Sequence, residues 1–229
     1  MEFKNTEVWG FKHALRGMRN PKDSWDKSDS EYWLPNKFME ENVSGEDIEW
    51  TPYHIGKNDM ELAQTLIKAG NEHCKFMRMI HVSVDVDMPR YWHSEADTYH
   101  FNTKNSCSTM HKLLNRNTPI TSDMFVTCEE DEDLWISIIA RLEKLRKEYK
   151  HIQSTTKDSA AMNRLLVRAK RLLTEGFLQM RTVDTNYAEL RNMYFQRRYH
   201  RLKEEWVDTF CEWVKTLPYA EELIMYEGR

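Results

Sequence analysis

The sequence lacks several features on which common classes of protein depend. The four cysteines of this 229-residue chain include no Cys-x-x-Cys pair, which argues against a zinc ribbon or a disulfide framework. We expect these cysteines to be reduced and mostly buried, as free cysteines usually are. Glycine is also scarce, with seven residues, and no Gly-rich phosphate loop occurs. An anion would therefore have to be bound by arginine side chains, hydroxyls and helix N-termini.

A long apolar run and an excess of basic residues are missing too. No run approaches the roughly 18 apolar residues that span a bilayer, and residues 1–11 lack the apolar stretch of a signal peptide. We therefore expect a cytoplasmic protein without a membrane partner. The formal net charge of -4 argues against nonspecific binding to nucleic acid, which requires an excess of Lys and Arg.

The chain does contain enough apolar material for a packed α+β domain. Apolar residues make up 40% of it, and its length lies within the range of a single core. We predict one domain over residues 1–229, with residues 1–57 as a loop-rich N-terminal arm that packs on it around one short helix at about 7–18. The predicted anchors of this arm are aromatic: Trp9, Trp25 and Trp33. A sharper hypothesis places an anion site along Arg16, Arg19 and Lys22.

Two elements are predicted ahead of the centre of the chain. Residues 59–73 carry an apolar stripe at helical spacing, and Asp59 is expected to cap the first turn. Residues 79–87 alternate strictly between apolar and polar, which predicts a strand. Its polar face holds His81, Asp85 and Asp87, which can bind a hard metal or serve acid–base chemistry. The alternative is a half-buried strand whose polar face meets water or a neighbouring subunit.

Helices dominate the second half of the chain. Apolar stripes predict core helices at 130–152 and 158–174. Asn186 with Glu189 forms a capping box for a helix that runs to about residue 203, followed by further helix through Trp213 and a final turn after Pro218. Between Pro89 and these helices, residues 98–111 read T-Y-H-F-N-T-K-N-S-C-S-T-M-H. This run of hydroxyls, amides and histidines without a core stripe suits a ligand-facing loop.

The order of these parts resembles the flavin-dependent thymidylate synthase family (ThyX). Its members carry G-H-E-S-P-F-E-H, an alternating strand, a proline, a short helix and the signature R-H-R-x7-S-x-R-Y, with N-E just before the serine. Here residues 70–76 read G-N-E-H-C-K-F, and the alternating strand, Pro89 and Asn105 to His111 follow. The resemblance covers roughly residues 59–215. It implies a ThyX-like α+β fold, with a small, mainly antiparallel sheet flanked by several long helices.

Particular residues follow from this resemblance. Aligning Ser108 with the signature serine places Asn105 on the signature asparagine. A second match over residues 186–197 places Arg197 on the arginine that recognises the uracil ring in the family. The resemblance therefore implies nucleotide binding by Asn105, Ser108 and Arg197, and cofactor binding by His73 and His100. It implies no metal.

The chain also departs from the family pattern. Thr98, Tyr99 and His100 stand where the family has R-H-R, and Met110 and His111 stand where it has R-Y. Losing two arginines removes charge-assisted bonds to the flavin diphosphate, so FAD is a doubtful cofactor. The string P-R-Y-W-H-S-E-A-D-T-Y also resembles phage-encoded relatives of the family, which suggests a separate branch.

The resemblance implies a homotetramer that binds a dUMP-like pyrimidine nucleotide, as a flavin-dependent thymidylate synthase or a related pyrimidine-modifying transferase. Two alternatives stay open. In the first, the chain is a non-catalytic binder, such as a phage protein that captures a nucleotide signal or a host partner. In the second, the hydroxyls are turn and cap residues and the basic residues form a solvated helix face. The hydroxyl residues are Ser106, Ser108 and Thr109. The basic residues are Arg197, Arg198, Arg201 and Lys203.

Overall fold

The computed structural model describes residues 1–32 and 53–228, and the chain divides into two compact units. The first, unit 1, comprises Met1–Glu2, Asp85–Thr98 and Lys104–Thr182; the second, unit 2, comprises Phe3–Val84, Tyr99–Thr103 and Val183–Arg229. The expectation of a single domain with a packed N-terminal arm stays a prediction.

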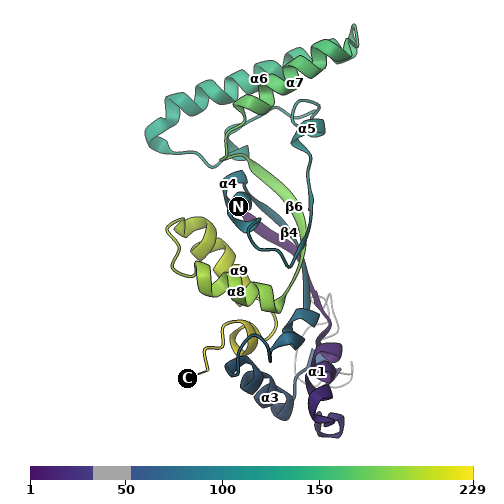
Figure 1. The fold of residues 1–229 in the computed structure, drawn as a ribbon. Coiled ribbons are helices and arrows are strands. Elements are labelled where there is room, and N and C mark those ends of the chain that lie inside the picture. The colour runs from purple at the N-terminus through teal and green to yellow at the C-terminus, as the bar shows by residue number, and fades with distance from the viewer. Residues whose placement is uncertain (33–52, 229) are drawn as a thin grey trace, which may run out of the picture. The chain divides into compact units, whose positions relative to one another are not determined.

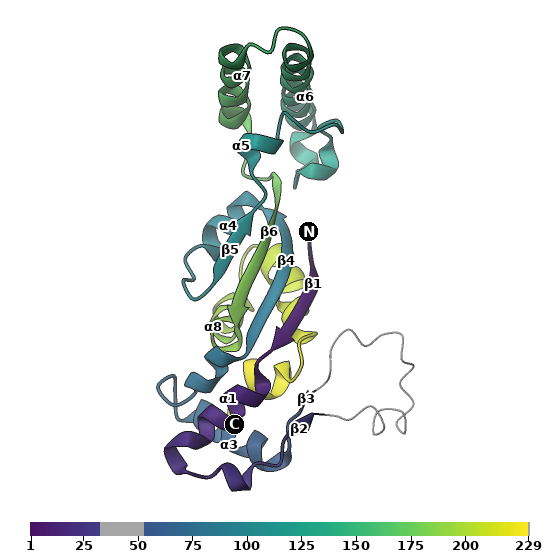
Figure 2. The same cartoon turned by 90° about the vertical axis from the view of Figure 1, so that its right-hand side faces the viewer.

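Four strands form one sheet in the order β1-β4-β6-β5 (Figure 2). Their bounds are Glu2–Trp9 for β1, His81–Pro89 for β4, Leu178–Asn186 for β6 and Thr103–Ser106 for β5. Backbone bonds bracket the pairing of β4 with β6: Arg90 N donates to Phe177 O, and Tyr187 N donates to Ile80 O. Because these pairs run in opposite directions along the chain, the two strands are antiparallel. The predicted α+β class with a small antiparallel sheet is confirmed.

Strand β4 alternates as the sequence predicts. Its apolar side chains and the preceding isoleucine are at most 2% exposed, and these are Ile80, Val82, Val84 and Val86. On the polar face, the His81 ring stacks on Trp9 at 5.5 Å, and Asp85 accepts from the Thr182 hydroxyl at 2.5 Å. Among the described residues, no group of three or more His, Cys, Asp or Glu side chains is arranged to hold a metal ion. The polar face therefore pairs with neighbouring residues, which favours the half-buried strand over the metal hypothesis.

The helices α6 (Glu132–Ser154) and α7 (Ser159–Leu172) lie side by side in unit 1 (Figure 1). Their bounds agree closely with the two predicted core helices. Asp158 begins α7, since its Oδ1 accepts from the backbone N–H groups of Ala160 and Ala161 at 2.9 and 3.0 Å. The fully buried residues of the stripe include Leu142 and Leu145. The predicted stripe includes Leu134, but this residue is 58% exposed. At about 100° per residue, position 134 lies at the edge of the face that Trp135, Ile138 and Leu142 turn toward the core.

Shorter elements complete unit 1. They are α4 (Arg90–Ala96), α5 (Thr109–Lys112), and the 3₁₀ turns η4 (Ser122–Met124) and η5 (Glu129–Asp131). The predicted loop over residues 98–111 is thus partly wrong, since it contains β5 and α5. The reason is backbone pairing: Cys107 N donates to Met180 O at 2.9 Å, which continues the ladder with β6. Polarity alone did not distinguish an exposed edge strand from a loop.

Unit 2 is mostly helical. Its helices are α1 (Phe11–Arg19), α3 (Lys57–Lys68), α8 (Tyr187–Arg197) and α9 (Glu212–Lys215), with 3₁₀ turns η1 (Asn20–Lys22), η2 (Trp25–Lys27) and η3 (Lys75–Met79) and π-helical segments η6 (Lys203–Cys211) and η7 (Ala220–Ile224). Strand β2 (Glu31–Tyr32) pairs antiparallel with β3 (Tyr53–His54). Large side chains such as Tyr187, Trp206 and Phe210 fill the core. The predicted helix to residue 203 ends early, at Arg197. Beyond it the His200 Nδ1 accepts from Leu202 N, a local side-chain bond that competes with the helix.

The N-terminal residues are more regular than predicted. Residues 2–9 form β1, and α1 begins only after Gly10. Gly10 has a φ of +98°, and a Cβ there would lie 2.1 Å from the Met79 carbonyl oxygen, so this turn requires glycine. Trp9 and Trp25 are 43% and 50% exposed, so they are not the expected core anchors, and Trp33 lies outside the described residues. Smaller apolar residues of α1 are buried instead: Phe11, Ala14, Leu15 and Met18.

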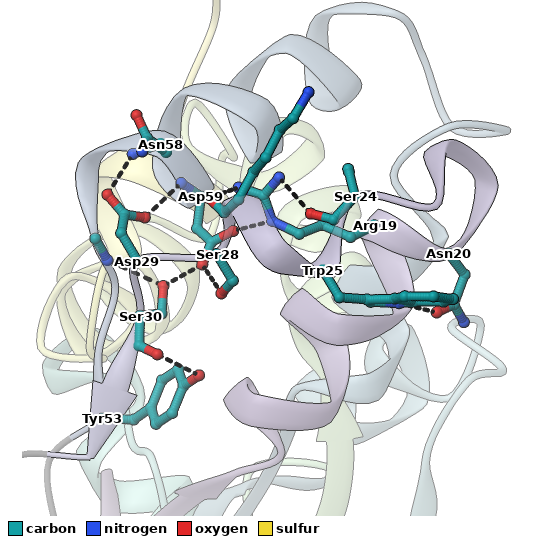
Figure 3. A network of polar contacts seen from close by, with 12 residues as sticks. Arg19, Asn20, Ser24, Trp25, Ser28, Asp29, Ser30, Tyr53, Asn58 and Asp59 are labelled. Atoms are coloured by element: carbon teal, nitrogen blue, oxygen red, sulfur yellow. Dashed lines mark hydrogen bonds and ion pairs between the residues drawn. The ribbon is translucent and has the colours of Figure 1, made fainter.

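A buried polar cluster joins the chain after α1 to the start of α3 (Figure 3). Asp59 is fully buried, and it accepts from Arg19 Nε at 2.5 Å and from the hydroxyls of Ser28 and Ser30 at 2.6 and 2.5 Å. The predicted cap role of Asp59 is therefore wrong. Asp29 caps α3 in its place, since its carboxylate accepts from the N–H groups of Asn58 and Asp59. The sequence did not indicate this, because the cap comes from a residue far away in the chain.

Cys74 and Cys211 are buried, but Cys107 and Cys128 are exposed, so the expectation of mostly buried cysteines is wrong for these two; all four are free thiols. Among the helices that the structure describes, none is both long enough and apolar enough to cross a membrane.

Candidate functional site

Unit 2 contains a cavity of about 400 Å³ on one face of α8, here named the α8 pocket. A volume of this order lies within the range of small-molecule sites, which is roughly 300–1,000 Å³. The side chains around it include amides, guanidinium groups and aromatic rings, together with the Cys74 thiol and the buried carboxylate of Glu189. They include Asn71, Asn192 and Gln196, then Arg78 and Arg191, and finally Phe101 and Phe195.

Asn186 builds one wall of the α8 pocket. Its Oδ1 accepts from Glu189 N at 3.0 Å and so caps α8, as predicted, while its Nδ2 donates to the Phe101 carbonyl at 3.3 Å. Asn102 Nδ2 donates to Tyr99 O at 2.8 Å and fixes the same short segment. The Phe101 ring is held at the pocket with 60% of its surface exposed. An exposed ring on a fixed backbone can stack on a flat ligand.

The cationic groups of the pocket differ in their surroundings. Arg78 is exposed, and its guanidinium lies 5.3 Å from the centre of the Phe101 ring. Arg191 stacks over Phe195 at 4.6 Å and donates to Ile224 O at 2.8 Å. Burial lowers the pKa of Arg191, although the neighbouring Cys74 and Glu227 oppose this shift. Arg191 is therefore a positioned cation, and Arg78 is the more adaptable of the two.

Cys74 adds a neutral group to the same pocket. Burial raises the pKa of its thiol, while the nearby Arg191 and Arg78 act in the opposite direction. Because the thiolate is the reactive form of cysteine, this environment does not favour Cys74 as a nucleophile.

Arg197 belongs to a hydrogen-bonded chain that reaches the α8 pocket. Its Nε donates to the Tyr99 hydroxyl at 2.9 Å, that hydroxyl donates to Gln196 Oε1 at 3.0 Å, and Gln196 Nε2 donates to Asn192 Oδ1 at 2.7 Å. The Arg197 guanidinium also lies 4.5 Å from the centre of the Trp206 ring. The interpretation of Arg197 as part of a solvated helix face is therefore wrong. It is half-buried and oriented by aromatic and hydroxyl contacts.

The two histidines predicted to bind a cofactor lie in the same unit but not in the pocket lining. His73 and His100 are exposed, and each directly precedes a lining residue in the sequence, Cys74 and Phe101. The sequence did contain a signal for the pocket. The α8 residues that line it recur at helical spacing, and they are Ala188, Glu189, Arg191, Asn192, Phe195 and Gln196. The contributions of Asn71, Arg78 and Phe101 come from distant segments and had no such signal.

Ser108 lies in unit 1 and begins α5. Its Oγ accepts from His111 N at 3.2 Å, so the alternative in which Ser108 is a cap residue is correct as far as this bond goes. Ser108 also lines a cavity of about 490 Å³, together with Lys112 and Arg116. The other walls of this cavity are largely apolar. Asn105 is exposed on β5 and is not among the lining residues.

Thr109, beside Ser108, is engaged by a lysine of α7. Lys170 Nζ lies 2.5 Å from Thr109 Oγ1. Burial lowers the pKa of Lys170, and Arg90 adds to the shift while Glu175 opposes it. The predicted nucleotide residues thus fall in different units, Asn105 and Ser108 in unit 1 and Arg197 in unit 2. Their convergence in one site stays a prediction.

The described fold is similar to solved structures of flavin-dependent thymidylate synthases. One is the crystal structure of ThyX from Helicobacter pylori complexed with FAD and dUMP, with a TM-score of 0.65 and 16% identity over 99% of this chain and 98% of that one. A second is Helicobacter pylori thymidylate synthase X with FAD and dUMP, with a TM-score of 0.66 and 16% identity over 100% and 99%. No family profile matches the sequence, and no curated protein matches it either. The structural likeness therefore establishes a ThyX-like fold for this chain, and at 16% identity it establishes the fold alone.

Proposed function

We propose that this protein binds a pyrimidine nucleotide of the dUMP type in the α8 pocket. The observation that carries the proposal is the combination of an exposed ring, two guanidinium groups and amides around one cavity. The solved structures with a similar fold were crystallised with dUMP and FAD. Aromatic rings stack on bases, guanidinium groups bind phosphate, and amides pair with the polar edge of a base.

Each group has a distinct role in this proposal. Phe101 provides the stacking surface, and Arg78 and Arg191 receive the phosphate. The amides of Asn192 and Gln196 meet the donors and acceptors of the base, and the bond from Tyr99 to Gln196 orients them. Arg197 is not among the lining residues, and it stabilises this arrangement through Tyr99. Direct recognition of the pyrimidine by Arg197, which the resemblance implies, would require its side chain to turn into the pocket.

The residues present fit a mononucleotide better than a flavin. Where the family has R-H-R, the Thr98 hydroxyl donates to Glu95 O, and the Tyr99 hydroxyl is engaged by Gln196 and Arg197. Neither residue supplies a guanidinium for a diphosphate. FAD would supply hydride chemistry if it bound, and it would depend on Arg78 and Arg191 for its phosphates. The roles of His73 and His100 toward such a cofactor are retained as proposals.

Titration calorimetry with dUMP tests the binding site. We expect binding by the native chain and a loss of about 1–3 kcal/mol for Phe101→Ala, the usual worth of one base stack. Arg78→Gln should weaken the binding of dUMP more than the binding of uridine, because only dUMP carries the phosphate. Tyr199→Ala is the matched control, since Tyr199 is an exposed ring of the same unit at 85% exposure outside the pocket lining. An absence of heat with every pyrimidine nucleotide would contradict the proposal.

The unit 1 residues are tested separately. Ser108→Ala removes the α5 cap together with any ligand contact, whereas Ser108→Asn retains a cap acceptor. If Ser108 binds the nucleotide, both variants should bind dUMP more weakly than the native chain. If Ser108 is only a cap, the Ser108→Asn variant should bind dUMP as the native chain does. Asn105→Ala, on the exposed β5, should weaken dUMP binding only if Asn105 contacts the nucleotide, and it should leave the fold stable in either case. Gel filtration measures whether the chain forms the proposed homotetramer.

The second candidate function is a non-catalytic binder with the same fold. The engagement of Tyr99 and Thr98 at the R-H-R position favours it. A turnover assay with dUMP, methylene-tetrahydrofolate, FAD and NADPH separates the two, because only an enzyme forms labelled product. The ultraviolet–visible spectrum of the purified chain shows at the same time whether a flavin is retained.

A further inference from the structure

Unit 2 contains a second polar cavity, of about 590 Å³, between the chain that follows α1 and the helix α3. It shares no residue with the α8 pocket. Three cationic residues line it: Arg19, Lys22 and Lys27. Glu61 is the carboxylate of the lining, and it forms an i,i+4 pair with Lys57 at 3.8 Å.

Arg19 is a fixed donor in this cavity. It is 4% exposed, and each of its three nitrogens makes one bond: Nε to Asp59, Nη1 to Ser24 O at 3.3 Å and Nη2 to Lys27 O at 3.1 Å (Figure 3). A guanidinium group has five N–H donors, so one on each Nη is not used by these bonds. Asp59 balances the charge of Arg19, and the net positive charge of the cavity therefore comes from the lysines.

Ser24 supplies an independent observation. It lines the cavity and is 7% exposed, and its hydroxyl has no hydrogen-bond partner among the described residues. Buried hydroxyls are nearly always bonded, so this one indicates a missing partner. Lys22 and Lys27, by contrast, are exposed, and they can move toward a ligand.

We propose that this cavity binds the phosphate group of a small phosphorylated molecule. Lys22 and Lys27 provide charge, the remaining N–H groups of Arg19 provide fixed donors, and the Ser24 hydroxyl bonds to a phosphate oxygen. A phosphate suits this set because it offers several acceptor oxygens and a double negative charge. Arg16, which the sequence grouped with Arg19 and Lys22, is not part of the lining.

The test is titration of the full chain with inorganic phosphate and with ribose 5-phosphate, followed by calorimetry and by ¹⁵N NMR. We expect amide shifts concentrated in residues 19–27 and saturable binding. Lys22→Gln with Lys27→Gln should weaken binding by about 10-fold or more, the size of one charge-assisted contact. Lys12→Gln with Arg16→Gln removes the same charge from exposed residues of α1 outside the lining and should change binding less than about twofold.

The outcomes separate this site from the α8 pocket. Phe101→Ala should leave phosphate binding unchanged even where it abolishes dUMP binding in the α8 pocket. Ser24→Ala should weaken phosphate while the midpoint of urea unfolding stays near the native value. The proposal would be overturned if the Lys22/Lys27 double variant and the Lys12/Arg16 double variant weakened phosphate binding equally. Amide shifts spread evenly over the chain would also overturn it. Tighter binding of ribose 5-phosphate than of inorganic phosphate would identify a phosphorylated small molecule as the ligand.

Discussion

The α6–α7 hairpin and the region around α1 and α3 are held together by different kinds of contact. The hairpin relies on apolar side chains at helical spacing, such as Leu142, Leu145 and Leu165. The α1–α3 region relies on a buried ion pair between Arg19 and Asp59, residues 40 positions apart. Apolar contacts tolerate small losses, whereas a buried charge without its partner is costly. The two regions should therefore respond differently to single substitutions.

The largest expected effect is that of Asp59→Ala. It leaves the buried Arg19 guanidinium without its carboxylate and should cost about 3–5 kcal/mol of unfolding free energy. Urea denaturation followed by circular dichroism measures this. Glu61→Ala is the control on the same helix, where the exposed pair with Lys57 should be worth at most about 1 kcal/mol. Similar losses for the two variants would remove the distinction between the regions.

Leu142→Ala tests the hairpin. Leu142 is fully buried, and truncation of a buried leucine costs about 2–5 kcal/mol through lost burial and a residual cavity. Leu134→Ala on the same helix, at 58% exposure, should cost less than about 0.5 kcal/mol. Thermal or urea unfolding measures both. A large loss for Leu134→Ala would mean that another surface covers this residue in solution.

The pH dependence of the unfolding free energy between about pH 6.5 and 4 should be dominated by His93 of α4. Burial lowers its pKa to about 4, with Arg181 adding to the shift and the bond from Nε2 to Gln179 O opposing it. The unfolded chain takes up this proton near pH 6.5, so stability should fall as pH falls from about 6.5 to 4, by roughly 3 kcal/mol in all. His93→Gln should flatten this dependence in denaturation measured across that window. His100→Gln, at an exposed histidine, should leave the dependence intact.

The smallest expected effect concerns the start of α7. Asp158→Ala removes the acceptor for the N–H groups of Ala160 and Ala161 and should cost about 1 kcal/mol. Asp158→Asn keeps a side-chain oxygen and should cost clearly less. The difference between the two variants in urea unfolding isolates the cap, and equal losses would show that the charge, not the bond, stabilises the helix.

Much of the fold could be predicted, because the relevant signals are local. The alternation over β4, the stripes of α6 and α7 and the cap at Asn186 each depend on residues that are close in the sequence. The Asp29 cap could not be predicted, since it comes from a residue 30 positions from Asp59. The same limit explains Trp9 and Trp25, because composition does not tell which aromatic residue faces the core.

The candidate site shows the same division. The α8 residues of the pocket were readable from helical spacing, but Phe101 and Arg78 enter it only through the fold. Arg197 was found through the resemblance to ThyX, and the structure shows its contacts with Tyr99 and Trp206. The cap function of Ser108 is one of the alternatives that the sequence offers, since serine serves caps for local reasons.

The turn at Gly10 has a practical consequence for any variant library of this protein. Every other amino acid would carry a Cβ into the Met79 carbonyl and would also need a positive φ. Two adjoining elements, β1 and α1, depend on that single backbone geometry, so selection for folded protein should recover almost only glycine at this codon. A fusion or circular permutation should leave this junction intact.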